Sequence, residues 1–238
     1  MASHPLSLLR SDMQSLSSPE RASASARFFK SGPGQYGEGD QFMGISVPDQ
    51  RKVAKNYRNL PLTDLEQLLI SPIHEERLIA LIILVHQFKL GDEPTQEIIY
   101  NFYLAQTAHI NNWDLVDSSA EFIVGPWLEH RDKHILVTLA HSRNLWERRI
   151  AMVSTFHYIK QGHPEEAFKI ATLLLHDSED LIHKAVGWML REIGKRCGQD
   201  VEETFLLQHY RTMPRTMLRY AIEHFPADRR QQYLSGLA

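Results

Sequence analysis

The chain has 238 residues, 43% of them hydrophobic and 23% charged, a composition typical of a soluble globular protein with a substantial core. Its single cysteine excludes a disulfide framework and any multi-cysteine metal site, and no apolar run approaches the roughly 18 residues that a membrane span needs. The net charge of −3 divides into +3 over residues 1–60, −8 over 61–142 and +2 over 143–238, so the total alone does not exclude a nucleic-acid partner.

The first 60 residues are expected to be helices joined by a glycine-rich connector. Residues 1–29 are rich in Ser and Ala and lack the apolar core of a secretory signal; two ordinary helices are favoured over a transit peptide. The sequence Ser18-Pro19-Glu20 predicts a helix start. The segment GPGQYGEGD at 32–40 has no GK[ST] ending and no preceding strand, so it is interpreted as a connector whose amides could touch a nucleic-acid phosphate.

Amphipathic helical patterns fill the rest of the chain, and no segment shows sustained strand-type alternation. The clearest patterns cover residues 76–88, 95–106, 147–159, 165–176 and 182–194. The sequence therefore predicts an all-α protein.

The helices repeat along the chain. ERLIAL at 76–81 matches ERRIAM at 147–152, and in that register five positions at spacings of 35 or 36 residues fall in one column: Leu78, Trp113, Arg149, Lys184 and Arg219. A period of one helix pair is typical of helical solenoids, in which equivalent positions line up along one curved surface.

The stretch NNWDLVDSSAEF at 111–122 places a tryptophan and two aspartates in one expected helix. Trp113 and Asp117 are four residues apart and would share one face. The repeat register adds Arg149, Lys184 and Trp188, and we expect all five side chains to line one concave groove. The alternative is that both tryptophans are ordinary core residues.

Other chemistry finds no support in the sequence. The thirteen histidines include no HExxH motif or other paired spacing, so no metal site is expected. Cys197 follows a predicted helix and is interpreted as a buried thiol. No cofactor is expected, and the lone cysteine favours a cytoplasmic location.

Four segments carry a further signal: FMGISVPDQRKVAK at 42–55, NNWDLVDSSA at 111–120, NLWERRIAM at 144–152 and HKAVGWMLREIGK at 183–195. Together they resemble the AlkD-type alkylpurine DNA glycosylases, which are DNA alkylation repair proteins built from HEAT-like repeats. The resemblance runs from about residue 20 to the C-terminus. It implies one domain over 1–238, a right-handed superhelical solenoid of HEAT-like helix pairs with a period of about 35 residues. Residues 1–60 would be its N-terminal helices and 61–238 its repeats.

The resemblance also implies a role for each site residue. Asp117 matches the family's catalytic aspartate, and Trp113 and Trp188 match the tryptophans that flank the damaged nucleotide. Arg149 matches an arginine on the DNA phosphates, and the neighbouring Arg148 and Lys184 are assigned to DNA binding with it. Phe28 stands where relatives carry Tyr, which keeps the ring and loses the hydroxyl.

The expected activity is a monofunctional DNA glycosylase that removes cationic alkylated purines, of the 3-methyladenine and 7-methylguanine class, from duplex DNA without enclosing the base. We therefore expect a monomer that acts in base excision repair. It would be associated with the nucleoid while it is bound to DNA. Two alternatives remain: a non-catalytic helical-repeat protein that binds damaged, bent or branched DNA, and a protein-interaction scaffold, which the acidic middle segment favours.

Overall fold

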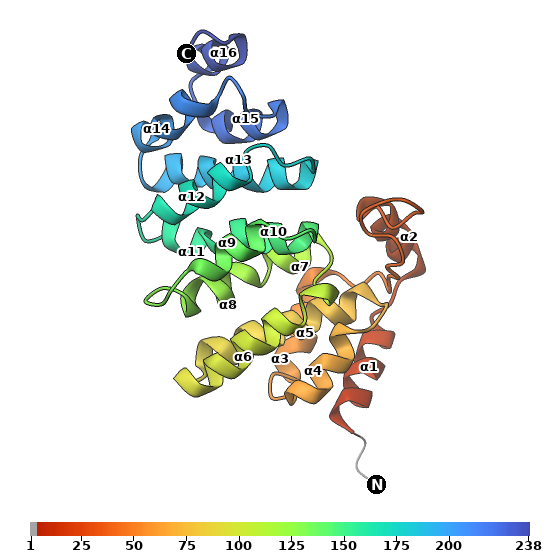
Figure 1. Ribbon diagram of the computed structural model, residues 1–238. Coiled ribbons are helices and arrows are strands. Elements are labelled where there is room, and N and C mark those ends of the chain that lie inside the picture. The colour runs from red at the N-terminus through yellow and green to blue at the C-terminus, as the bar shows by residue number, and fades with distance from the viewer. Residues whose placement is uncertain (1–3) are drawn as a thin grey trace. The chain divides into compact units, whose positions relative to one another are not determined.

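The computed structural model describes residues 4–238, and its regular structure is helical (Figure 1). Within residues 4–238 there is no strand, only an isolated bridge between Gln41 and Ile73, and the all-α prediction is confirmed. No helix in this range is long and apolar enough to cross a membrane. The chain divides into two compact units, one ending at Ser119 and the other beginning at Ala120, while the single domain over 1–238 stays a prediction.

The first unit is built around one long helix. Helix α5 packs against α3, α4, α6 and α7, and it is buried nearly all round, as an apolar helix at the centre of a helical unit must be. The helices of this unit are α1 (Pro5–Ser15), α2 (Pro19–Phe28), α3 (Val47–Asn56), α4 (Leu62–Leu69), α5 (His74–Leu90), α6 (Glu93–Ala105), the 3₁₀ helix η1 (Thr107–His109) and α7 (Trp113–Asp117).

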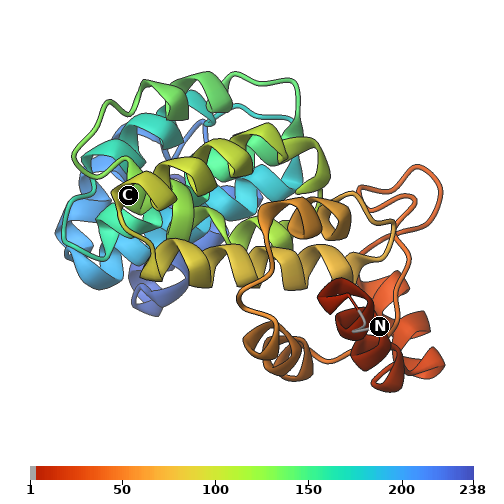
Figure 2. The same ribbon diagram turned by 90° about the horizontal axis from the view of Figure 1, so that it is seen from below.

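Local sequence signals fix where α2 and α3 begin. The side chains of Ser18 and Ser46 accept hydrogen bonds from the backbone N–H groups of Arg21 and Asp49, and each helix has Pro in its first turn. The predicted helix start at residues 18–20 is confirmed. The glycine-rich segment is a loop between these helices, as expected, and Figure 2 shows it at the edge of the first unit.

The second unit repeats helix pairs with the predicted period. Helices α10, α13 and α15 begin at Leu145, Asp180 and Arg215, which gives two successive spacings of 35 residues, and Figure 1 shows them stacked in order. The helices of this unit are α8 (Ala120–Trp127), α9 (His134–Ala140), α10 (Leu145–Ser154), α11 (Phe156–Ile159), α12 (Glu165–Leu173), α13 (Asp180–Arg196), α14 (Gln199–His209), α15 (Arg215–Ala221), the 3₁₀ helix η2 (Ile222–His224) and α16 (Ala227–Ser235).

Gly187 sets the approach of α13 to α15. A Cβ atom at this position would lie 2.5 Å from the carbonyl oxygen of Met217 and 2.5 Å from Cβ of Tyr220. These distances are shorter than packed carbon atoms allow, so the glycine of the KAVGWM segment is required by packing between the two helices.

The helical pattern over 147–159 forms two helices rather than one. The hydroxyls of Ser154 and Thr155 donate to the carbonyl oxygens of Ile150 and Met152, at 2.6 and 2.7 Å. Such bonds back to the preceding turn compete with the helix ladder and bend it. Helix α10 therefore ends at Ser154, and α11 begins at Phe156.

Candidate active site

Helix α7 carries the tryptophan and the aspartate singled out in the sequence. Trp113 is its first residue and Asp117 its last, and both side chains are half-buried. The side chain of Asn112 accepts a hydrogen bond from the backbone N–H of Trp113 at 2.9 Å, which starts the helix there. The hydroxyl of Ser119 donates to the carbonyl of Leu115 at 2.6 Å, and the chain leaves the helix after one turn. The buried helix expected in this stretch is thus only a little over one turn long.

The helix starts place Asp117, rather than Trp113, in the repeat register. Leu78, Arg149, Lys184 and Arg219 are each the fifth residue of their helix, and the fifth residue of α7 is Asp117. The predicted column is therefore displaced by one turn at α7. The meeting of all five side chains in one groove, which would require residues of both units, stays a prediction.

Asp117 lies near a buried tyrosine of the first unit. Burial raises the pKa of Tyr103, and the negative charge of Asp117 raises it further. The Tyr103 hydroxyl is 3.0 Å from the Ser119 hydroxyl. The carboxylate thus lies at the edge of the core with its side chain half-exposed, a position from which it can meet a ligand.

Phenylalanine rings cover Trp113 on two sides. The ring of Phe29 stacks on Trp113 at a centroid distance of 5.4 Å, and Phe28 meets Trp113 edge-on at 5.8 Å. Phe28 is 63% exposed although it is a large apolar side chain. An exposed ring held beside a half-buried tryptophan is suited to contact a flat or apolar part of a ligand.

Beneath these rings, a buried histidine bridges two carboxylates. Nδ1 of His74 is 3.0 Å from Asp40, and Nε2 is 2.8 Å from Asp114, while the His74 side chain is only 2% exposed. Arg77 is 2.6 Å from the other oxygen of Asp40. Because both ring nitrogens face carboxylate oxygens, both donate, which is possible only for a protonated imidazole.

The charges of this cluster support one another. Burial disfavours a charged His74, but its hydrogen bonds to Asp114 and Asp40 outweigh burial and raise its pKa to about 9. Burial likewise opposes ionisation of Asp40, but the hydrogen bond from His74 and the charge of Arg77 hold the pKa of that carboxyl below its usual value. Two negative and two positive charges therefore balance at neutral pH.

The raised pKa of His74 makes the stability of the first unit depend on pH. Because the folded protein binds this proton more tightly than the unfolded chain, the contribution is fully present below the unfolded pKa of 6.5 and is lost as the pH rises through about 9. The shift corresponds to about 3 kcal/mol. We expect urea unfolding of the wild type to show this loss between pH 7 and 10, and a His74→Gln variant to show a flatter profile over the same range.

Sequence reasoning missed this cluster. Asp114 was visible in the 111–122 stretch but received no role, and His74 begins the sequence HEER directly before an apolar run. Four polar residues directly before the apolar run LIALIILV are a signal, because charged side chains there must be paired if they are buried. All four are buried, and Glu76 pairs with Arg10 at 2.9 Å.

The glycine-rich loop uses several of its amides internally. The N–H of Gly32 donates to the Gln35 side chain at 3.0 Å, and that of Gly34 donates to Glu38 at 2.9 Å. The Glu38 carboxylate on the Gly34 amide disfavours a phosphate at the same place, and the Gly32 amide already has an acceptor. The loop is therefore a connector, anchored at its end by Asp40, and these two amides are not available as a phosphate cradle.

The cations assigned to DNA binding lie in the second unit, and each has a partner within it. Arg148 pairs with Asp177 at 2.6 Å, and Lys184 pairs with Asp180 at 2.7 Å. Arg149 is 5% exposed and donates to the carbonyl of Leu181 at 2.6 Å. Lys184 is the most accessible of the three, so it is the best placed to exchange its partner for a phosphate.

Trp188 lies on α13, one turn beyond Lys184. Its ring is half-buried and meets Phe156 edge-on at 5.7 Å. The ring of Phe156 is itself faced by the ammonium group of Lys160 at 4.4 Å. The second unit therefore presents a half-buried tryptophan on the same helix as an accessible lysine, while the predicted roles of both residues stay predictions.

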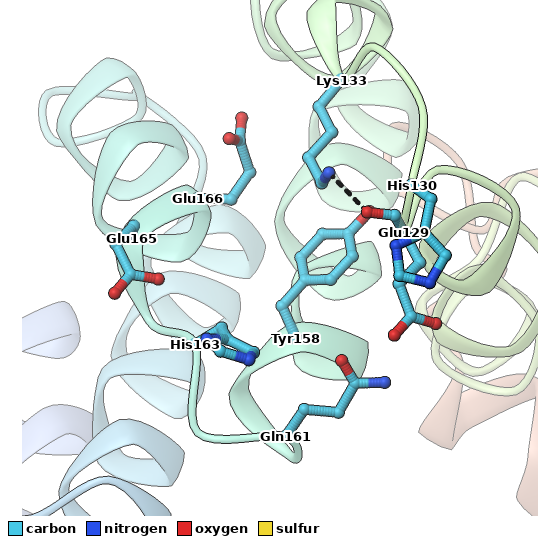
Figure 3. Close-up of a pocket in the computed structure, with 8 residues that line it drawn as sticks. All are labelled: Glu129, His130, Lys133, Tyr158, Gln161, His163, Glu165 and Glu166. Carbon is cyan, nitrogen blue, oxygen red and sulfur yellow. Dashed lines mark hydrogen bonds between the residues drawn. The ribbon is translucent and has the colours of Figure 1, made fainter.

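The second unit also has a cavity of about 330 Å³, which is lined by other residues. Figure 3 shows the ring of Tyr158 at its centre and the ammonium group of Lys133 bonded to the carbonyl of Glu129. The carboxylate of Glu129 accepts from His157 at 3.0 Å, so its charge is already partnered. None of the predicted site residues lines this cavity, and it is not part of the candidate active site.

The sequence matches the family model of DNA alkylation repair enzymes over residues 9–225. The chain belongs to this family. As a DNA alkylation repair protein it is expected to act on DNA, which agrees with the resemblance found in its motifs. No curated protein sequence matches the chain significantly.

Solved structures share the fold of this DNA alkylation repair protein. A predicted DNA alkylation repair enzyme from Enterococcus faecalis matches with a TM-score of 0.67 at 18% identity, over 89% of this chain and 97% of its own. AlkD2 from Streptococcus mutans matches with a TM-score of 0.54 at 17% identity, over 93% of this chain and 98% of its own. The smu.31 protein of Streptococcus mutans UA159 matches with a TM-score of 0.51 at 18% identity, over 92% and 96%. At these identities the likeness shows the fold alone.

Proposed function

We propose that the protein is a monofunctional DNA glycosylase, which hydrolyses the N-glycosidic bond of cationic alkylated purines in duplex DNA. The observation that carries this proposal is the one-turn helix α7, which presents a half-buried carboxylate and a half-buried tryptophan, the tryptophan lying beside an exposed phenylalanine. Membership in the DNA alkylation repair family supplies the substrate class.

The chemistry needs little more than these groups. A purine alkylated at N3 or N7 carries a positive charge and is already a good leaving group. When the bond to C1′ breaks, its electron pair stays with the base, and positive charge develops on the deoxyribose. Asp117 would stabilise that charge and orient a water molecule, whose oxygen bonds to C1′ and whose proton is released, leaving an abasic site.

Aromatic faces can stabilise the same developing cation. A cation over a tryptophan ring gains about 0.5–2 kcal/mol, depending on how far it is desolvated. Trp113, which lies on the same helix as Asp117, is assigned this role, while the same role for Trp188 stays a prediction; Phe28 is assigned an apolar contact to the DNA. The exposed ring of Phe28 can make such a contact without the hydroxyl of the Tyr that relatives carry there.

Lys184 offers a test of DNA contact that does not depend on catalysis. We expect Lys184→Ala to weaken binding of undamaged duplex DNA a few-fold and to reduce the slope of log affinity against log salt by about 1. Lys169→Ala is the matched control, because Lys169 also pairs with a carboxylate within its own helix but is not among the predicted site residues. Equal salt slopes in both variants would remove Lys184 from the interface.

Release of 7-methylguanine from methylated duplex DNA, measured without heating, tests the proposal directly. The wild type should release the base and leave abasic sites, with no strand cleavage before alkali is added. Tight DNA binding with no release would favour the non-catalytic alternative, and no DNA binding would favour an interaction scaffold.

A further inference from the structure

The His74 cluster joins two segments that are distant in sequence. Asp40 ends the glycine-rich loop, and Asp114 is the second residue of α7, next to Trp113. Neither segment is tied to the other by a helix ladder. The imidazole between them, at 3.0 and 2.8 Å, is therefore a direct polar link from the loop to the candidate active-site helix.

We propose that His74 is a positioning residue, which ties the glycine-rich loop to α7 and thereby fixes Trp113 and Asp117 for the reaction. The inference rests on the proposed glycosylase function for its catalytic consequence, while the link itself is a property of the first unit. His74 is buried and does not touch substrate, so it acts only through Asp40, Asp114 and the phenylalanine rings beside it.

Stacked rings connect His74 to Trp113 by a second route. The imidazole lies 4.7 Å from the ring of Phe29 and 4.9 Å from that of Phe42, and Phe29 stacks on Trp113. Phe29 and Phe42 also stack on each other at 5.4 Å, so the charged imidazole lies beside a pair of rings whose quadrupoles favour it, in addition to the carboxylates. Loss of the imidazole would therefore weaken the support of the Phe29 ring that stacks on Trp113. It would also remove the hydrogen bond to Asp114 of α7.

Loss of the proton alone should have a similar effect. The charged groups in contact with the cluster are Asp40 from the loop, Asp114 from α7, and Arg77 from α5 itself. With His74 neutral, two carboxylates would face one guanidinium, and one imidazole nitrogen would point a lone pair at a carboxylate. The uncompensated charge is carried mainly by Asp114, since Arg77 stays on Asp40.

The experiment compares full-length His74→Gln, Asp114→Asn and wild type, with His157→Gln as the matched control. His157 also pairs with a carboxylate, Glu129, but lies in the second unit. The measurements are single-turnover release of 7-methylguanine between pH 7 and 10, affinity for undamaged duplex, and amide hydrogen exchange of residues 31–41 and 111–118.

We expect His74→Gln to slow base release about 10- to 100-fold, because small displacements of reacting groups are costly, while DNA affinity changes less than about 3-fold. Exchange in both segments should rise, whereas His157→Gln should change neither. Wild-type release should fall as the pH rises through about 9, and Asp114→Asn, which removes one of the charges that favour protonation, should move that fall to lower pH.

Several outcomes would overturn the inference. A folded His74→Gln variant with wild-type exchange in both segments would show that His74 ties nothing. An alkaline fall that stays in place in Asp114→Asn would show a structural role only. If the wild type releases no base, the proposed function fails, but the exchange results still decide the link. If His74→Gln does not fold, Asp114→Asn decides it by the same exchange measurement.

Discussion

Replacement of Asp117 by Asn should lower the rate of 7-methylguanine release at least about 100-fold, because the carboxylate is the charged group assigned to the developing sugar cation. The variant keeps the size and polarity of the side chain and removes only the charge. Since Asp117 is half-buried at the end of α7, the fold should tolerate the change. DNA affinity should stay equal or rise slightly, because a negative charge facing phosphates is lost.

Single-turnover kinetics with saturating protein isolate this effect from binding. Asp132→Asn is the matched control, since Asp132 is an exposed aspartate of the second unit with no assigned role. A normal rate of base release in Asp117→Asn would exclude Asp117 from the mechanism. A loss of rate together with a loss of DNA binding would indicate that the carboxylate positions the protein rather than the transition state.

The sequence was most informative where structure repeats. The spacing of Arg149, Lys184 and Arg219 at 35 residues matches the spacing of the starts of α10, α13 and α15. The period is regular because each repeat contributes an equivalent helix that packs on its neighbours. Hydrophobic periodicity was less informative where a side chain ends a helix by bonding to the helix backbone. Ser119 and Thr155 each end a helix through a hydroxyl bond to the backbone, and hydrophobic periodicity does not register such bonds.

The candidate site was predictable only in part. Trp113 and Asp117 could be found from their spacing, since residues four apart share a helix face. The partnership of Asp40, His74 and Asp114 could not, because it joins residues 34 and 40 positions apart through tertiary packing. The burial of Arg149 was equally invisible, because an arginine in an amphipathic pattern is ordinarily read as exposed.

Glu75, the first glutamate of the HEER sequence, binds the backbone that follows the glycine-rich loop. Glu75 is 2% exposed, and its oxygens accept hydrogen bonds from three consecutive backbone N–H groups, those of Met43, Gly44 and Ile45, at 3.0, 2.8 and 3.3 Å. Gly44 has φ +74°, and a Cβ atom there would lie 2.3 Å from the carbonyl oxygen of Ser18. The chain can pass this closely against the start of α2 only as glycine.

Glu75→Ala should therefore destabilise the first unit by about 3–5 kcal/mol, because three amides at a buried position lose an ionised acceptor at once. Glu75→Gln keeps one acceptor oxygen and should cost about half as much. The free energy of unfolding from urea titration measures the total, and amide hydrogen exchange should locate the loss within residues 4–119.

Glu97→Ala provides the comparison, because Glu97 is exposed on α6 and a surface change there should stay within about 0.5 kcal/mol. A Glu75→Ala variant as stable as this control would mean that water replaces the carboxylate on all three amides. The graded order Ala, Gln, wild type would instead show that the first turn of α5 holds the loop region by charge, with Glu75 fixing the backbone after the loop and His74 fixing Asp40 at its end. Two adjacent residues of the first turn of α5 would then hold both the backbone beside the start of α2 and the candidate active-site helix α7.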